Sequence, residues 1–287
     1  MGLGVMGTPM ALNLARKYPL TVWNRTASKY PLVRQAGAEV AETPRALVDA
    51  SDVVFTMLFN EAAFQSILGA EFMEGLRGKT IINTSSVSVS FSQDLADQVH
   101  QAGGHFIEMP VSGSKVPAEQ GQLIGMIAGE PSVAERIRPL VEPITKNAVY
   151  CGEIGTGLKT KYAVNLYLIT MTAGLAESMA LARAQGLDIK AFGRVLDAGP
   201  MASAYSKLKV AKMIDQDWSA QAAIKDCYNL TQLIDSASDA VHAHSPLIHL
   251  SGLLYKQAIE RGLGDHDMIA IEKVLGNTVN WAGPKKN

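Results

Sequence analysis

The first half of the chain alternates between short β-branched runs and amphipathic stretches, and this alternation constrains its fold more than any other feature. The β-branched runs are bounded by turn residues and predict strands over 20–23, 53–58, 80–83, 105–109, 123–128 and 148–150. Helical patterns lie between several of them, over 10–17, 30–36, 44–50 and 91–102. Strands that alternate with helices are typical of βαβ units, so we expect a mostly parallel sheet.

The pattern changes after about Gly157. A single apolar segment, rich in Ala, Leu and Met, runs from Lys159 to Gln185, and Gly186 is placed to end it as a helix. Further helical patterns follow over 189–198, 220–242, 247–261 and 268–275, with almost no strand pattern. The sequence therefore predicts an α/β domain over 1–154, an interdomain helix over 155–186 and an all-α domain over 187–287, with residues 283–287 frayed.

Composition and charge exclude several classes of protein. Of the 287 residues, 47% are apolar and 18% are charged, which excludes a disordered chain and indicates a large buried core. The 26 basic and 27 acidic residues give a net charge of −1, so we do not expect a protein that binds nucleic acid through its phosphates. Because no apolar run approaches the length of a membrane span and no cleavable leader opens the chain, we expect a cytoplasmic protein without a membrane partner.

Cysteine and histidine usage does not point to a disulfide or metal protein. Cys151 and Cys227 are the only cysteines and lie far apart in the sequence, which argues against a disulfide framework or a cysteine zinc site. His242, His244 and His249 cluster in the sequence, but no carboxylate lies at a convincing ligand spacing from them. We therefore expect no metal site.

The chain opens on a glycine pattern, Gly2-Leu3-Gly4-Val5-Met6-Gly7, which matches G-x-G-x-x-G. In that pattern glycines let the backbone turn tightly and approach a pyrophosphate at the start of a helix. The pattern is informative when a strand precedes it, and here only Met1 does. We therefore expect the innermost strand of the sheet to be missing from this sequence and its start to be truncated.

A second pattern concerns the choice of cofactor. The strand predicted over 20–23 is followed by Asn24-Arg25-Thr26, at the position where an NAD-binding chain carries an acidic residue for the ribose hydroxyl. A carboxylate there would repel a 2′-phosphate, whereas Arg25 can pair with it through two hydrogen bonds and Thr26 can donate another. The sequence therefore predicts that NADPH is preferred over NADH.

Several linked motifs occur in order along nearly the whole chain. They are Gly2–Gly7 with Met10-Ala11 and Asn13-Leu14, then Asn24-Arg25-Thr26, then Pro110-Val111-Ser112-Gly113, then Gly155-Thr156-Gly157 followed by Lys161 and Asn165. In order and spacing they resemble the β-hydroxyacid dehydrogenase family. The resemblance implies a Rossmann-type domain followed by an all-α domain, an active site in the cleft between them, and a homodimer or homotetramer.

In that family the catalytic acid/base is a lysine on the interdomain helix, and the resemblance assigns this role to Lys161. Its ammonium can donate a proton to a carbonyl oxygen as hydride arrives at carbon, and the neutral amine can take the proton back. Asn165 lies four residues later, on the same side of the helix, where it can hydrogen-bond the substrate or orient the lysine. The alternative, which spacing alone favours, is an ordinary solvated lysine such as Lys159.

The resemblance also implies binding residues in the first domain. The run Ser112-Gly113-Ser114 matches the loop that holds the substrate carboxylate, although the family usually has a second glycine where this chain has Ser114. Ser86 matches a residue on the nicotinamide side, and its alternative is a helix N-cap. Leu58 matches a segment beside the cofactor, and its alternative is core packing.

Two further matches lie in the predicted all-α domain. Lys225, with Asp226, resembles a lysine-aspartate pair that closes over the cofactor and the substrate, and the alternative is a pair exposed on a helix. Asp267 matches another frequently acidic position, for which we expect a structural role.

The resemblance predicts an NADPH-dependent enzyme that reduces a small carboxylate-bearing aldehyde or oxidises a β-hydroxy acid. The second hypothesis is a non-catalytic dehydrogenase-like module that binds a nucleotide or a protein, because a missing central strand would weaken the sheet. Such modules typically lose the lysine that Lys161 matches. An imine reductase is less expected, since those enzymes usually carry Asp or Tyr there, and a 6-phosphogluconate dehydrogenase is disfavoured by length and by the absence of a histidine beside Asn165.

Overall fold

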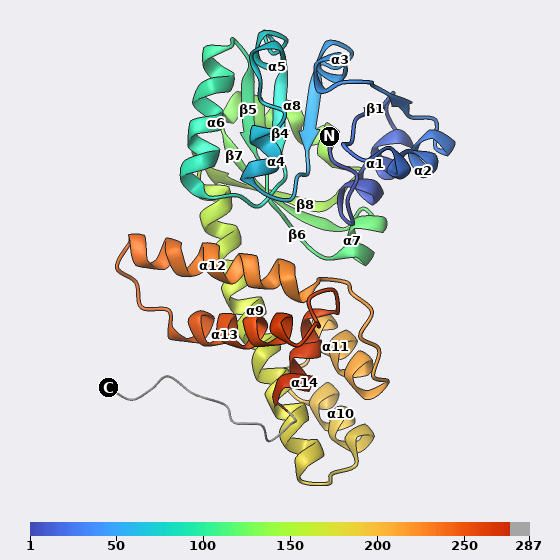
Figure 1. The fold of residues 1–287 in the computed structure, drawn as a ribbon, viewed down its shortest axis with the longest axis vertical. Coiled ribbons are helices and arrows are strands. Elements are labelled where there is room, and N and C mark those ends of the chain that lie inside the picture. The colour runs from blue at the N-terminus through green and yellow to red at the C-terminus, as the bar shows by residue number, and fades with distance from the viewer. Residues whose placement is uncertain (276–287) are drawn as a thin grey trace. The chain divides into compact units, whose positions relative to one another are not determined.

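The computed structural model describes residues 1–275 and divides into two compact units, drawn in Figure 1. The first unit covers residues 1–162 and the second begins at Ala163, so the division falls inside the long helix α9 (Thr156–Ala184). The first unit is a Rossmann-like α/β domain and the second is helical, which confirms the predicted fold class. The predicted domain bounds stay a prediction, and residues 283–287 lie outside the described residues.

Six strands of the first unit form one sheet in the order β3-β4-β5-β7-β6, with β8 paired to β7. They are β3 (Val53–Thr56), β4 (Thr80–Asn83), β5 (His105–Glu108), β6 (Val111–Ser112), β7 (Leu123–Gly129) and β8 (Thr145–Gly152). The pairs β3/β4, β4/β5 and β7/β8 are parallel, whereas β7 runs antiparallel to both β5 and β6. The strand–helix alternation therefore predicted the parallel part of the sheet but not the reversal at β7.

Two more strands, β1 (Thr21–Val22) and β2 (Glu39–Val40), form a separate parallel pair. The start of the chain connects this pair to the larger sheet, because Gly2 N donates to Trp23 O (3.1 Å) while Met57 N donates to Met1 O (2.9 Å). A cavity of about 560 Å³ lies beside these residues, and its lining includes residues of α1, β1 and β3. The expected innermost strand stays a prediction.

Nine helical segments accompany the strands in the described part of the first unit before α9 begins. They are α1 (Gly7–Ala15), η1 (Ala27–Lys29), α2 (Tyr30–Gln35), α3 (Pro44–Asp49), α4 (Glu61–Gln65), α5 (Ala70–Glu74), α6 (Val89–Gln101), α7 (Lys115–Glu119) and α8 (Pro131–Val141). Leu14 of α1 and Ile137 of α8 share one buried cluster with Ile107 and Ile127 of the sheet. Helix α6 packs against β5 and buries Leu95. These contacts hold the ends of the strands, and the loops that follow them, in place.

In its described residues, 163–275, the second unit is built from helices. It comprises the remainder of α9, then α10 (Ile189–Ala198), α11 (Ala204–Ile214), α12 (Ile224–Ala240), α13 (Pro246–Glu260), η2 (Met268–Ile271) and α14 (Glu272–Leu275). Gly186 has a φ of +72° and ends α9, as predicted, because its conformation lets Leu187 N donate back to Ala182 O (3.0 Å). By length and composition α9 could cross a membrane, but the core helix of a soluble protein passes the same test.

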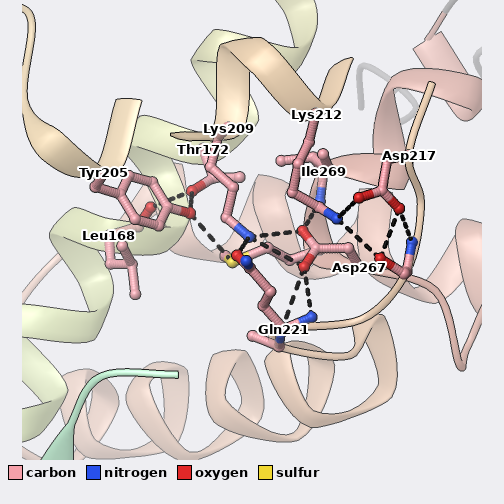
Figure 2. Close-up of polar contacts among 12 residues, drawn as sticks. Leu168, Thr172, Tyr205, Lys209, Lys212, Asp217, Gln221, Asp267 and Ile269 are labelled. Atoms are coloured by element: carbon pink, nitrogen blue, oxygen red, sulfur yellow. Dashed lines mark hydrogen bonds and ion pairs between the residues drawn. The ribbon is translucent and has the colours of Figure 1, made fainter. Parts of the chain in front are cut away.

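A buried ion pair joins α11 to the start of η2, as Figure 2 shows. Lys209 Nζ lies 2.8 Å from Asp267 Oδ1, and the two side chains are 2% and 0% exposed. Asp267 also accepts hydrogen bonds from Gln221 N (2.8 Å) and Ile269 N (3.3 Å). A buried charge needs such partners, so these contacts agree with the structural role expected for Asp267.

Candidate active site

The three glycines of the opening motif differ in their surroundings. A Cβ at Gly2 would lie 2.2 Å from Met57 O, and a Cβ at Gly7 would lie 2.0 Å from Gly2 O, so both positions need glycine for the backbone to pack. A Cβ at Gly4 would meet no atom within 4 Å. Helix α1 begins directly after this loop, and no side chain caps it. The open space at Gly4, beside the start of a helix that no side chain caps, fits a pyrophosphate group.

The predicted cofactor-selecting residues lie next to this loop. Leu3 N donates to Asn24 Oδ1 (2.9 Å), and Asn24 Nδ2 donates to Thr26 O (3.0 Å), so Asn24 ties the glycine loop to the loop after β1. Arg25 and Thr26 are exposed, and the Arg25 guanidinium makes no hydrogen bond or ion pair within residues 1–275. The structure therefore brings these residues to the side of the glycine loop with the arginine available to a ligand.

Leu58 and Ser86 follow neighbouring strands of the sheet. Leu58 N donates to Ser85 Oγ (2.8 Å), and its Cδ2 lies 3.1 Å from where a Gly2 Cβ would be, which places Leu58 beside the glycine loop. The helix-cap alternative for Ser86 is wrong, because α6 is capped by Ser88, whose Oγ accepts from Phe91 N (3.2 Å). Ser86 is half-buried and forms no part of that cap.

Lys161 is held against the predicted substrate loop. It is 8% exposed, and its Nζ donates to Val111 O (2.8 Å), the residue directly before Ser112. Burial lowers the pKa of Lys161 to about 8, because the interior disfavours the charged form. The alternative of an ordinary solvated lysine is therefore wrong, and the ammonium and the Ser112 loop, 50 residues apart in sequence, lie together.

The loop after β6 has a backbone shape that needs glycine. Gly113 has a φ of +131°, and a Cβ there would lie 2.7 Å from Leu123 Cδ2. Ser114 follows at the start of α7, and its side chain makes no capping hydrogen bond. At the other end of α7, Asn13 Nδ2 of α1 donates to Ala118 O (2.8 Å). The helix that follows the glycine motif is thus bonded to the helix that follows the Ser112 loop.

Two predicted site residues belong to the second unit. Asn165 lies one turn beyond Lys161 on α9, is buried, and its Nδ2 has no hydrogen-bond partner among residues 1–275. Lys225 lies in the first turn of α12, with its Nζ 2.5 Å from Asp265 Oδ1. This hydrogen bond raises the pKa of Lys225. A cofactor-binding role for Lys225 stays a prediction.

Glu108, the last residue of β5, belongs to none of the sequence motifs that predicted the site. Its side chain is completely buried, and it accepts hydrogen bonds from the start of α9, the helix that carries Lys161. The sequence signal that could have identified Glu108 is its position as a lone carboxylate in the apolar run 106–111, because a charge buried there needs polar partners.

Two family models together match almost all of the described chain. Residues 1–152 match the NAD binding domain of 6-phosphogluconate dehydrogenase. Residues 155–275 match the model described as NAD-binding of NADP-dependent 3-hydroxyisobutyrate dehydrogenase.

Curated relatives match over similar lengths. Glyoxylate/succinic semialdehyde reductase 2, chloroplastic, of Arabidopsis thaliana is 33% identical over 96% of this chain and 78% of its own length. Glyoxylate/succinic semialdehyde reductase 1 of the same plant is 32% identical over 94% of this chain and 95% of its own length. The cytokine-like nuclear factor N-PAC of Aedes aegypti is 32% identical over 88% of this chain but only 46% of its own length.

Solved structures share the fold. A 3-hydroxyisobutyrate dehydrogenase from Salmonella typhimurium superposes with a TM-score of 0.87 at 22% identity, covering 95% of this chain and 97% of that one. Psf3 in complex with NADP⁺ and 2-OPP gives a TM-score of 0.88 at 25% identity, covering 96% of this chain and 98% of that one. With two family models and two reductases above 30% identity in agreement, the chain belongs to the β-hydroxyacid dehydrogenase family and is an NAD(P)-dependent oxidoreductase.

Proposed function

We propose that this enzyme transfers a hydride between NADPH and a small carboxylate-bearing aldehyde, or the corresponding β-hydroxy acid in reverse, with Lys161 as the general acid/base. One observation carries the proposal: a buried lysine is held 2.8 Å from Val111 O, directly beside Ser112. The names of the two Arabidopsis thaliana relatives, glyoxylate/succinic semialdehyde reductases, support the substrate class. Turnover of NADPH with a panel of small semialdehydes tests it, and no turnover with any of them would count against it.

The chain's own residues supply the proton and the binding contacts. NADPH, when bound by the glycine loop, supplies the hydride. The Lys161 ammonium donates a proton to the aldehyde oxygen as the carbonyl carbon is reduced, which yields the alcohol and leaves a neutral amine. In the reverse direction the neutral amine takes the hydroxyl proton. The Ser112 hydroxyl and the backbone N–H groups of Gly113 and Ser114 hold the substrate carboxylate. Asn165, whose Nδ2 has no hydrogen-bond partner among residues 1–275, is available to bond the substrate or orient Lys161.

Cofactor choice rests on Arg25 in this proposal. Arg25→Ala should raise the Kd for NADPH about 10- to 100-fold, because a lost charge-assisted hydrogen bond costs about 1.5–3 kcal/mol. The Kd for NADH should not change. Titration followed by nicotinamide fluorescence measures both constants. Arg34→Ala, which removes an exposed arginine from α2, is the matched control. An equal rise in the Kd for NADPH and the Kd for NADH in Arg25→Ala would refute the selecting role of Arg25.

The pKa of Lys161, lowered by burial to about 8, sets the expected pH dependence. Reduction needs the ammonium form, so the rate of aldehyde reduction should fall as the pH rises through about 8. Oxidation needs the neutral amine, so its rate should rise through the same pH. Measuring kcat in both directions at constant ionic strength checks the sign, and two profiles that change in the same sense would contradict this assignment.

The N-PAC relatives favour a second candidate, a dehydrogenase-like module without turnover. They are named as nuclear factors and not by a reaction, and this chain spans about half their length. The buried Lys161 beside Ser112 favours the enzyme instead. Binding of NADPH without turnover of any aldehyde or hydroxy acid would favour the module.

We also propose a homodimer or homotetramer that is cytoplasmic and has neither a nucleic-acid nor a membrane partner. Three leucines of α13 support the oligomer: Leu247, Leu250 and Leu253 are 63%, 36% and 42% exposed at a spacing that places them along one side of the helix. Sedimentation of the purified protein measures the oligomeric state.

A further inference from the structure

Glu108 makes an unusual set of contacts for a carboxylate. Its Oε1 accepts from Leu158 N (2.8 Å), both oxygens lie within 3.2 Å of Gly155 N, and its Oε2 accepts from Ser92 Oγ (2.5 Å). The residue is 0% exposed. Gly155 directly precedes α9 and Leu158 lies in its first turn, where backbone N–H groups have no partner inside the helix. A strand residue 50 positions away therefore caps α9.

The glycines of Gly155-Thr156-Gly157 make this contact possible. A Cβ at Gly157 would lie 2.9 Å from Glu108 Oε1 and 2.6 Å from Met126 O, so a side chain there would displace the carboxylate or the strand. Gly155 has a φ of +97°, a conformation that favours glycine, and it presents its N–H to Glu108. The two glycines of the motif that precedes Lys161 thus allow the Glu108 carboxylate to contact the start of α9.

The capped turn leads directly to Lys161. Lys161 lies three residues after Leu158, which is nearly one helical turn, and its Nζ is bonded to Val111 O, three residues after Glu108. Within the run 108–111, the Glu108 carboxylate therefore accepts from the first turn of α9, and the Val111 carbonyl accepts from the Lys161 ammonium. All of these residues lie in the first unit.

We propose that Glu108 is a positioning residue that fixes Lys161 beside the Ser112 loop by anchoring the first turn of α9. The inference rests on the proposed role of Lys161 as the acid/base. A carboxylate suits this place because it can accept several N–H groups at once and complements the positive end of the helix. Burial raises the pKa of Glu108, while the hydrogen bonds from Ser92, Leu158 and Gly155 oppose that shift.

Three variants test the inference in the full chain. Glu108→Ala should lower kcat about 10- to 100-fold, because small displacements of a catalytic group have effects of this size, while the Kd for NADPH stays unchanged. Glu108→Gln keeps the shape and one acceptor oxygen, so it should restore most of kcat. Glu130→Ala removes the carboxylate that caps α8 in the same unit by accepting from Ser132 N, and it should leave kcat unchanged.

The pH profile distinguishes positioning from a general loss of stability. Loosening the first turn admits water to Lys161, so in Glu108→Ala the fall in reductive rate should move from about pH 8 toward the ordinary lysine value of 10.5. Tyr162, the next residue on the helix, donates to Val87 O, and burial raises the pKa of its phenol above the ordinary value. Its titration therefore lies above the pH range in which the fall near pH 8 is measured. Hydrogen exchange at the amides of 155 and 158 should become faster in the same variant.

The outcomes separate this inference from the proposed function. Wild-type kcat and an unshifted pH profile in Glu108→Ala, while Lys161→Met is inactive, would overturn the positioning role alone. Full turnover in Lys161→Met would overturn the acid/base role itself. If Glu108→Ala does not fold, Ser92→Ala, which removes one donor to Glu108, decides the matter: a smaller loss of kcat with a shift of the profile to higher pH supports the inference, and no change overturns it.

Discussion

Lys161→Met should lower kcat by about 10²–10⁴-fold, the usual contribution of a positioned general acid. Methionine keeps the length of the side chain and suits its buried place, but it can neither give nor take a proton. The Kd for NADPH should stay within about twofold, because Lys161 bonds to Val111 O and the glycine loop is held by other residues. Steady-state kinetics and a fluorescence titration of the same preparation measure the two effects.

Lys159→Met is the matched control for this substitution. Lys159 lies on the same helix two residues earlier and is exposed, so its loss should leave kcat unchanged. A similar loss of activity in both variants would mean that the helix, and not the amine of Lys161, was damaged. Retained turnover in Lys161→Met would remove the acid/base from the mechanism.

Asp267→Ala should reduce the free energy of unfolding by about 3–5 kcal/mol, since it leaves the Lys209 ammonium buried without a partner. The change also removes the acceptor for Gln221 N and Ile269 N, which Figure 2 shows converging on the same carboxylate. Lys209→Met should cost a similar amount, because Asp267 is then the unpaired buried charge. Urea unfolding followed by circular dichroism gives both values.

Lys212→Met provides the comparison on the same helix. Lys212 pairs with Asp217, which is 48% exposed and therefore keeps its hydration when the lysine is lost. We expect a cost of about 1 kcal/mol or less. Equal costs for Lys209→Met and Lys212→Met would show that burial of the Lys209–Asp267 pair does not determine its contribution.

Long elements with a clear period were predictable from sequence alone. The helix predicted over 189–198 has the same bounds as α10, and Gly186 ends α9 as expected. Helices α8 and α11 were not predicted, and in α8 Pro139 interrupts the helical pattern. The strand predicted over 20–23 contains β1, but the two-residue strands β2 and β6 are too short to show a period and were not predicted.

The same distinction applies to the candidate site. The glycine loop and Lys161 were recognisable because each belongs to a motif with fixed local spacing. A structural role was expected for Asp267, but its pairing with Lys209 and the role of Glu108 were not recognisable, because Lys209 lies 58 residues from Asp267 and Gly155 lies 47 residues from Glu108. Sequence shows which residues carry charge, but it does not show which distant amides or ammonium groups will surround them.

Three contacts or proposed roles fall within the five residues 108–112: Glu108 caps α9, Val111 O accepts from Lys161 Nζ, and Ser112 begins the loop proposed to hold the substrate carboxylate. A substitution or insertion here would disturb several of them together. Gly113 is constrained as well, because its φ of +131° and the 2.7 Å between an added Cβ and Leu123 Cδ2 require glycine. The residues after it are less constrained, since the Ser114 side chain makes no capping hydrogen bond and Val116 is 37% exposed. In the proposed mechanism, the residues that hold Lys161 and the residues that can vary to fit a different aldehyde are therefore neighbours in the sequence, and the change from one to the other falls between Gly113 and Ser114.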